Sequence, residues 1–89
     1  MKKILLITTD GCYACQVMHN MIKEALSNTR AVVNYERVNR KDLDSSYLKR
    51  YKINDFPIIQ YIIDDVVMFQ TEGTYPSAVV NRYIDVHLK

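Results

Sequence analysis

The stretch Lys3-Ile4-Leu5-Leu6-Ile7-Thr8-Thr9-Asp10-Gly11-Cys12-Tyr13-Ala14-Cys15 decides the fold of this chain. Its apolar run over residues 3–8 is typical of a buried β-strand. The three residues that follow break the strand with a glycine-containing turn. From Cys12 to about Ser27 the apolar residues recur at helical spacing, which predicts a helix with one buried face. That face carries Cys15, Met18, Ile22 and Leu26. Two cysteines therefore lie where the first strand gives way to the first helix.

The rest of the chain continues this alternation. The patterns predict a strand over 31–38, a short helix capped by Asp42 or Asp44 and ending near Tyr51, a central strand over 57–63, a turn at Asp64-Asp65, a strand over 66–71, and a last helix over 74–89 with Thr74 as its cap and Pro76 in its first turn. A helix between two strands favours a parallel crossover, whereas a two-residue turn gives an antiparallel hairpin. We expect one α/β domain over residues 1–89 with the order βαβαββα. Its four-stranded mixed sheet has strands one to three parallel, strand four antiparallel, and helices on both faces.

Composition narrows the class of protein. The 89 residues carry 12 basic and 10 acidic side chains, a net charge of +2, which excludes a strongly electrostatic nucleic-acid binder. No apolar run approaches the roughly 18 residues that span a membrane, and the apolar stretch near the start is too short for a signal peptide. We expect a cytoplasmic, monomeric protein with no nucleic-acid or membrane partner. The local excess of basic residues is interpreted as a solvated face: Arg37, Arg40, Lys41, Lys49, Arg50 and Lys52.

The cysteine pair points to reactivity or metal binding. Cys12 and Cys15 are the chain's two cysteines, whereas a disulfide-stapled secreted domain carries four or more. A bridge over so short a loop stabilises by only about 2 kcal/mol. The start of a helix carries a partial positive charge that favours a thiolate at Cys12, although the Asp10 carboxylate opposes it. Cys15, one turn further on the apolar face, is close enough to form a disulfide. Cys12 is thus the candidate nucleophile and Cys15 the candidate resolving thiol.

Three segments together resemble the thioredoxin superfamily. They are Asp10-Gly11-Cys12-Tyr13-Ala14-Cys15 after the first strand, the stretch over 47–59 that contains Phe56-Pro57, and the hairpin that precedes Gly73. The similarity covers nearly the whole chain, and it is greatest to short thioredoxin- or glutaredoxin-like proteins. It implies a thioredoxin-like fold in which the bond before Pro57 is cis and lies beside the cysteines.

The resemblance also implies an activity. It is that of a thiol–disulfide oxidoreductase that acts on protein or small-molecule disulfides without a bound cofactor. The upstream reductant is thioredoxin reductase or glutathione. Substrate contacts fall on Tyr13, Phe56, Pro57 and Gly73. No metal ligand is implied.

The chain departs from the family pattern in several places. Tyr13-Ala14 separates the cysteines, and Glu72-Gly73-Thr74-Tyr75 stands where glutaredoxins carry the paired glycines and acidic residue that hold glutathione, which disfavours a glutathione site. The buried acid of thioredoxins has no clear counterpart, and Asp10 and Tyr35 are the candidates for it.

Two other functions remain open at this point. Cys12, Cys15 and His19 form a C-x₂-C-x₃-H pattern that supplies three ligands to a copper or zinc carrier, although a closed zinc site needs four. Otherwise His19 is a solvated helix residue. A thioredoxin-like fold also serves as a redox-sensing or binding module without turnover.

Overall fold

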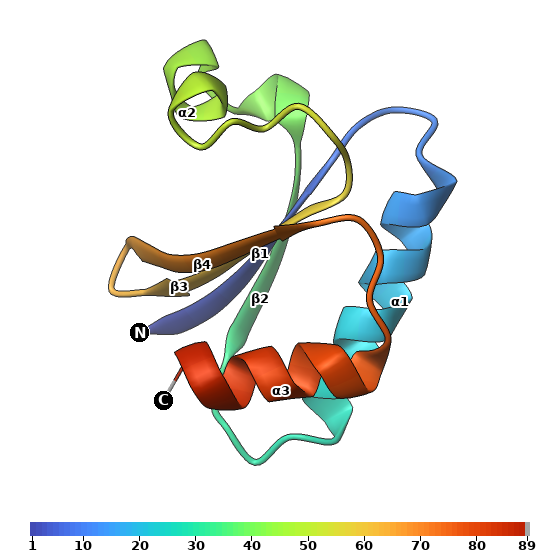
Figure 1. Ribbon diagram of the computed structural model, residues 1–89, viewed down its shortest axis with the longest axis vertical. Helices are drawn as coiled ribbons and strands as arrows, with labels where there is room; N and C mark the ends of the chain where they lie inside the picture. The colour runs from blue at the N-terminus through green and yellow to red at the C-terminus, as the bar shows by residue number, and fades with distance from the viewer. Residues whose placement is uncertain (89) are drawn as a thin grey trace.

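The computed structural model describes residues 1–88, and its elements follow the predicted order (Figure 1). They are β1 (Lys2–Thr8), α1 (Tyr13–Ser27), β2 (Asn34–Asn39), the 3₁₀ turn η1 (Arg40–Asp42), α2 (Ser45–Arg50), β3 (Ile58–Ile63), β4 (Val66–Glu72) and α3 (Ser77–His87). The four strands form one mixed sheet in the order β2-β1-β3-β4. The two most apolar strands, β1 and β3, are therefore the central ones, as their composition requires.

The direction of β3 corrects the sequence-based expectation. β1 and β2 are parallel, but β3 runs antiparallel to β1, and β4 runs antiparallel to β3. A parallel β3 would need a connection that carries the chain back along the sheet, over about 20 Å for a six-residue strand. The six residues of α2 span only about 9 Å. The rest of the connection, η1 and loops, also lies at the end of the sheet where β2 finishes, so β3 starts from that end and runs in the opposite direction.

Helices cover the two faces of the sheet unequally. Figure 1 shows α1 and α3 together on one side, whereas α2 lies beyond one end of the strands. Under α1 and α3 lies the larger core cluster, built on Ile4, Leu6, Met18, Ile22, Ala25, Ile59, Tyr61, Val80, Ile84 and Leu88. The alternate side chains of the strands form a smaller cluster on the other face, built on Leu5, Ile7, Ile53, Ile58 and Ile62, which α2 partly covers. The alternation of strand side chains thus builds two cores from one sheet.

Several element ends differ from the expected ones. The second strand begins at Asn34 because pairing with β1 begins there. Thr74 does not cap α3; Pro76 occupies the N-cap position and the helix begins at Ser77. A proline restricts the residue before it to extended backbone, so the helix cannot run through Tyr75. The hairpin turn at Asp64-Asp65 is as expected, with both residues at positive φ, as a two-residue turn of this kind requires.

Candidate active site

The register of the sheet brings four chain segments to one end. Thr8 of β1 pairs with Asn39 of β2, Ile7 pairs with Ile58 of β3, and Ile58 pairs with Glu72 of β4. The segments that follow β1, β2 and β4, and the segment that precedes β3, therefore meet at this end. The candidate residues Cys12, Phe56, Pro57 and Gly73 all lie in these segments.

The two cysteines occupy opposite environments at the start of α1. Cys12 is the N-cap residue, with extended backbone, and its Sγ accepts the backbone N–H of Cys15 at 3.1 Å. The two are joined by a disulfide, with their Cα atoms 5.2 Å apart. Cys12 is partly exposed, whereas Cys15 is 1% exposed. Attack from solvent is therefore restricted to the Cys12 sulfur, and a negative charge there is stabilised by the helix start and its N–H group.

The segment before β3 contains the expected cis bond, between Phe56 and Pro57. Pro57 is buried and Phe56 is half-buried. The N–H of Gly73, a residue at φ +92°, donates to the carbonyl of Pro57 at 2.9 Å. This hydrogen bond joins two of the four candidate substrate residues. The third, Tyr13, is 82% exposed at the first position of α1 and points out beside the cysteines.

Asp10 is an exposed, paired carboxylate and does not act as a buried acid. Its Oδ2 lies 2.8 Å from the Lys41 ammonium, and its Oδ1 accepts from the Asn39 side chain at 3.0 Å. The hydrogen bond from Lys41, followed by that from Asn39, lowers the pKa of Asp10 below its ordinary value. Among residues 1–88 no acidic side chain is buried. Cys15 therefore has no carboxylate behind it.

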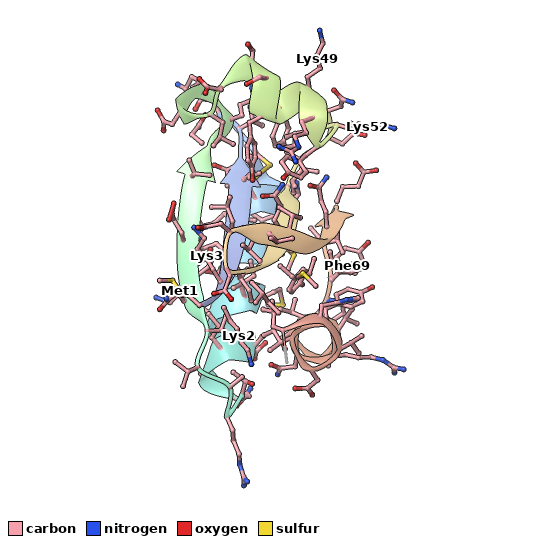
Figure 2. The ribbon with its side chains drawn as sticks, turned by 90° about the vertical axis from the view of Figure 1, so that its left-hand side faces the viewer. Met1, Lys2, Lys3, Lys49, Lys52 and Phe69 are labelled. Atoms are coloured by element: carbon pink, nitrogen blue, oxygen red, sulfur yellow. A yellow bond between two sulfur atoms is a disulfide. The ribbon has the colours of Figure 1, made fainter. Side chains whose placement is uncertain are left out.

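Sequence reasoning missed the contacts of Lys41 and Arg40, which it placed on a solvated face. Lys41 pairs with Asp10, and Arg40 donates from Nε to the Thr9 hydroxyl at 3.1 Å. The parallel pairing of β1 and β2 was the available signal, since it places the residues after both strands at one end. Lys49 and Lys52, by contrast, are exposed at the α2 end and point away from the body of the protein (Figure 2).

His19 is held by the sheet instead of being a freely solvated helix residue. Its Nδ1 and the Tyr35 hydroxyl share a hydrogen bond of 2.7 Å between α1 and β2. Burial lowers the pKa of His19, with smaller contributions from the positive charges of Arg37 and Lys23, and burial raises the pKa of Tyr35 to about 12. In the described part of the chain, no three His, Cys, Asp or Glu side chains converge as metal ligands. The three ligands that a metal carrier would use are thus not assembled.

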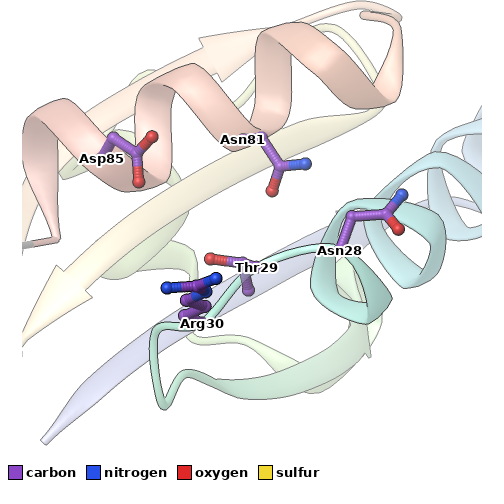
Figure 3. Close-up of a pocket in the computed structure, with 5 residues that line it drawn as sticks. All are labelled: Asn28, Thr29, Arg30, Asn81 and Asp85. Carbon is purple, nitrogen blue, oxygen red and sulfur yellow. The ribbon is translucent and has the colours of Figure 1, made fainter.

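Two cavities flank α1, and their linings differ. A cavity of about 440 Å³ is lined by Asn28, Thr29, Arg30, Asn81 and Asp85, between the end of α1 and α3 (Figure 3). It lies a whole helix length from the cysteines, about 22 Å for 15 residues. A second cavity, of about 310 Å³, is lined by Val17, Met21, Thr74, Tyr75 and Pro76 and has no charged lining residue. The second one adjoins the segment that follows Gly73, and so it is the cavity on the side of the candidate site.

Comparison with known proteins shows the fold. No protein-family model and no curated protein matches the chain. Among solved structures, the chain superposes on thioredoxin-2, a component of the malaria parasite's protein secretion machinery, with a TM-score of 0.81 and 13% identity over 98% of this chain and 84% of that one. Chloroplastic thioredoxin z gives 0.78 and 16% identity over 99% and 79%. A Schistosoma mansoni thioredoxin gives 0.75 and 17% identity over 97% and 78%.

The helices were expected not to include a membrane-spanning segment. Within residues 1–88, none of the helices has the length and apolar character needed to cross a bilayer.

The match to three thioredoxin structures extends over almost all of the chain, whose elements have the order βαβαββα and whose four strands form one mixed sheet. The chain therefore has the thioredoxin fold.

Proposed function

We propose that this protein is a thiol–disulfide oxidoreductase that reduces disulfides through the Cys12–Cys15 couple. The observation that carries the proposal is the contrast between the two sulfurs at one helix start. Cys12 is partly exposed and its Sγ accepts a backbone N–H, whereas Cys15 is buried one turn further on. Two buried thiols that only fill the core, or a disulfide that only stabilises the fold, would not need this difference in exposure between the two cysteines.

The reaction proceeds in two exchanges. The Cys12 thiolate attacks one sulfur of the substrate disulfide, a Cys12–substrate S–S bond forms, and the departing substrate sulfur takes up a proton. Cys15 then loses its proton and attacks the Cys12 sulfur, which re-forms the Cys12–Cys15 disulfide and releases the second substrate sulfur as a thiol. Two electrons pass from the dithiol to the substrate. The sulfurs themselves store these electrons, so the cycle needs no bound cofactor.

The substrate groups are proposed to bind beside Cys12. Phe56 offers its backbone to an extended chain, Pro57 is held beside it by the hydrogen bond from Gly73, and the Tyr13 ring contacts the partner. An extended polypeptide that carries a disulfide suits these backbone groups. The dithiol must be regenerated by an upstream reductase or thiol, which places the activity in a reducing compartment such as the cytosol.

Single cysteine variants test the mechanism. With insulin as the disulfide substrate and dithiothreitol as the electron source, we expect Cys12→Ser to reduce the rate to that of the protein-free control. Cys15→Ser should accumulate a mixed disulfide with the substrate, visible by mass spectrometry, because the resolving thiol is gone. Full turnover by the Cys12→Ser protein would refute the assignment. A dithiol that titrates without turnover in the wild type would instead favour a redox-sensing module.

The electron donor can be tested separately. NADPH with thioredoxin reductase is compared with NADPH, glutathione and glutathione reductase on the same substrate. We expect the first pair to sustain turnover at least about tenfold faster, because no lining residue of the cavity beside Gly73 is charged and able to pair with a glutathione carboxylate. Equal or faster turnover with glutathione would contradict this choice of donor and leave the cysteine mechanism intact.

A further inference from the structure

The loop between β1 and α1 is fixed by side chains from the last residue of β2 and from the segment that follows it. We call these contacts the loop clamp: Asn39 and Lys41 bind the Asp10 carboxylate, and Arg40 binds the Thr9 hydroxyl. The segment is itself ordered, since the Asn39 side chain accepts the backbone N–H of Lys41 at 3.0 Å. The loop clamp thus joins the ends of two parallel strands just before the helix that carries the cysteines.

The position of Asp10 gives the loop clamp a chemical consequence. Asp10 precedes Cys12 by two residues, so an unpaired carboxylate would repel the Cys12 thiolate. For two unit negative charges about 7 Å apart in water, Coulomb repulsion corresponds to about a two- to threefold loss of thiolate. The Lys41 ammonium, 2.8 Å from the carboxylate, offsets the negative charge.

We propose that Lys41 is a positioning residue that keeps Cys12 reactive by pairing with Asp10, an inference that rests on the proposed function for its biological use. Lys41 acts through Asp10: it pairs with the carboxylate and neutralises its charge. Without Lys41, the carboxylate is free to oppose the thiolate that starts the reaction.

Other charged groups lie at this end of the sheet. They are Arg40 and Asp42 of η1, Asp55 before β3 and Glu72 at the end of β4, and the first turn of α1 contains no acidic residue. Lys41 makes the largest contribution to the lowered pKa of Asp10, and the positive charge of Arg40 makes a smaller one. Among residues 1–88, no ion pair involves Arg40, Asp42, Asp55 or Glu72. A comparison of variants at positions 10 and 41 leaves these charges unchanged, so their contributions cancel.

The test is a double-mutant cycle on the reactivity of the Cys12 sulfur. The reduced full chain is alkylated with iodoacetamide over a range of pH, and mass spectrometry assigns the label to Cys12. The variants are Lys41→Met, Asp10→Asn and the double variant. Below the midpoint of the titration we expect Lys41→Met to react about two- to threefold more slowly than wild type. The double variant should react at the rate of Asp10→Asn, because Lys41 has no charge left to neutralise.

Matched variants separate this effect from general ones. Lys49→Met removes an exposed lysine of α2 that points away from the body of the protein, and it should leave the rate unchanged (Figure 2). Lys41→Arg should restore the wild-type rate, because arginine keeps the charge. Far-UV circular dichroism checks that each variant is folded.

Two outcomes would overturn the proposal. One is a Lys41→Met protein that reacts as fast as wild type or faster. The other is a slow rate that persists in the Asp10→Asn background, which would mean that Lys41 acts directly on the sulfur. The alkylation needs neither a disulfide substrate nor a reductase. A protein without turnover would therefore contradict the proposed function and leave the result on Lys41 standing.

Discussion

The two sulfurs differ in their surroundings although the residues are chemically identical. Cys12 lies at the open start of α1, where its Sγ accepts an N–H, and Cys15 lies one turn inside, sealed by the core. One helical turn separates a partly exposed cysteine from a buried one. The proposed division into nucleophile and resolving thiol rests on this difference in helix position, since the two residues are of the same type.

His19 is the residue whose burial predicts a pH dependence of stability. Its pKa in the folded protein lies below the ordinary value of 6.5, mainly because burial disfavours the charged ring. As pH falls, the unfolded chain takes up this proton before the folded protein does, so the free energy of unfolding decreases. The contribution is fully present above pH 6.5 and is lost as pH falls through the lowered pKa.

Urea unfolding between about pH 7.5 and about pH 5 measures this contribution. We expect the decrease in the free energy of unfolding to be smaller in His19→Gln than in wild type. Tyr35→Phe should keep the decrease, because burial and not the hydrogen bond to Tyr35 is the main cause of the shift. Identical pH dependence in wild type and His19→Gln would show that another group is responsible.

At the scale of elements, a chain of partly buried hydrogen bonds joins α2 to the sheet. The Tyr47 hydroxyl donates to Gln60 Oε1, Gln60 Nε2 donates to Gln70 Oε1 at 2.9 Å, and Gln70 Nε2 donates to the carbonyl of Tyr51 at 2.8 Å. Gln60 is 0% exposed at the centre of β3. A buried amide is tolerated there because both ends of its side chain are hydrogen-bonded. The helix too short to cross the sheet is thus attached to it by polar contacts.

Substitution of Gln60 tests this attachment. Gln60→Leu keeps the volume similar but leaves the Tyr47 hydroxyl and the Gln70 Oε1 without their partners. We expect a loss of about 1–3 kcal/mol in the free energy of unfolding, measured by urea denaturation. Gln16→Leu, on the exposed side of α1, serves as the control and should change it by less than about 0.5 kcal/mol. Equal effects of the two changes would argue against a structural role for the buried chain.

On the scale of the whole molecule, the core under α1 and α3 joins the ends of the sequence. Side chains from β1, α1, β3 and α3 meet in the same cluster, so the helix that carries the cysteines rests on residues from the last 15 of the chain. The last helix therefore supports the candidate site through the shared core.

Paired variants on α3 measure this support. Ile84 is 1% exposed in the shared core, whereas Val86, two residues later, is 62% exposed. Ile84→Ala should lower the free energy of unfolding by about 2–5 kcal/mol through the lost burial and the cavity left behind. Val86→Ala should change it by less than about 0.5 kcal/mol. A small effect of Ile84→Ala would mean that α3 is not part of the cooperative core.

The sequence alone determined the element order, the hairpin at Asp64-Asp65, and the position of the cysteines at the start of α1, because these features depend on interactions between neighbouring residues. Apolar periodicity and turn residues act over a few neighbours, so they can be interpreted without a tertiary structure. The cis bond before Pro57 followed from a resemblance and not from such rules. The direction of β3, the contact of Lys41 with Asp10 and that of His19 with Tyr35 were decided only by the tertiary structure. Each of these features depends on the position that a short helix or a strand end takes in the folded chain. His19 and Tyr35 are 16 positions apart in the sequence, and Lys41 lies still further from Asp10, so these pairs come into contact only after the sheet has formed.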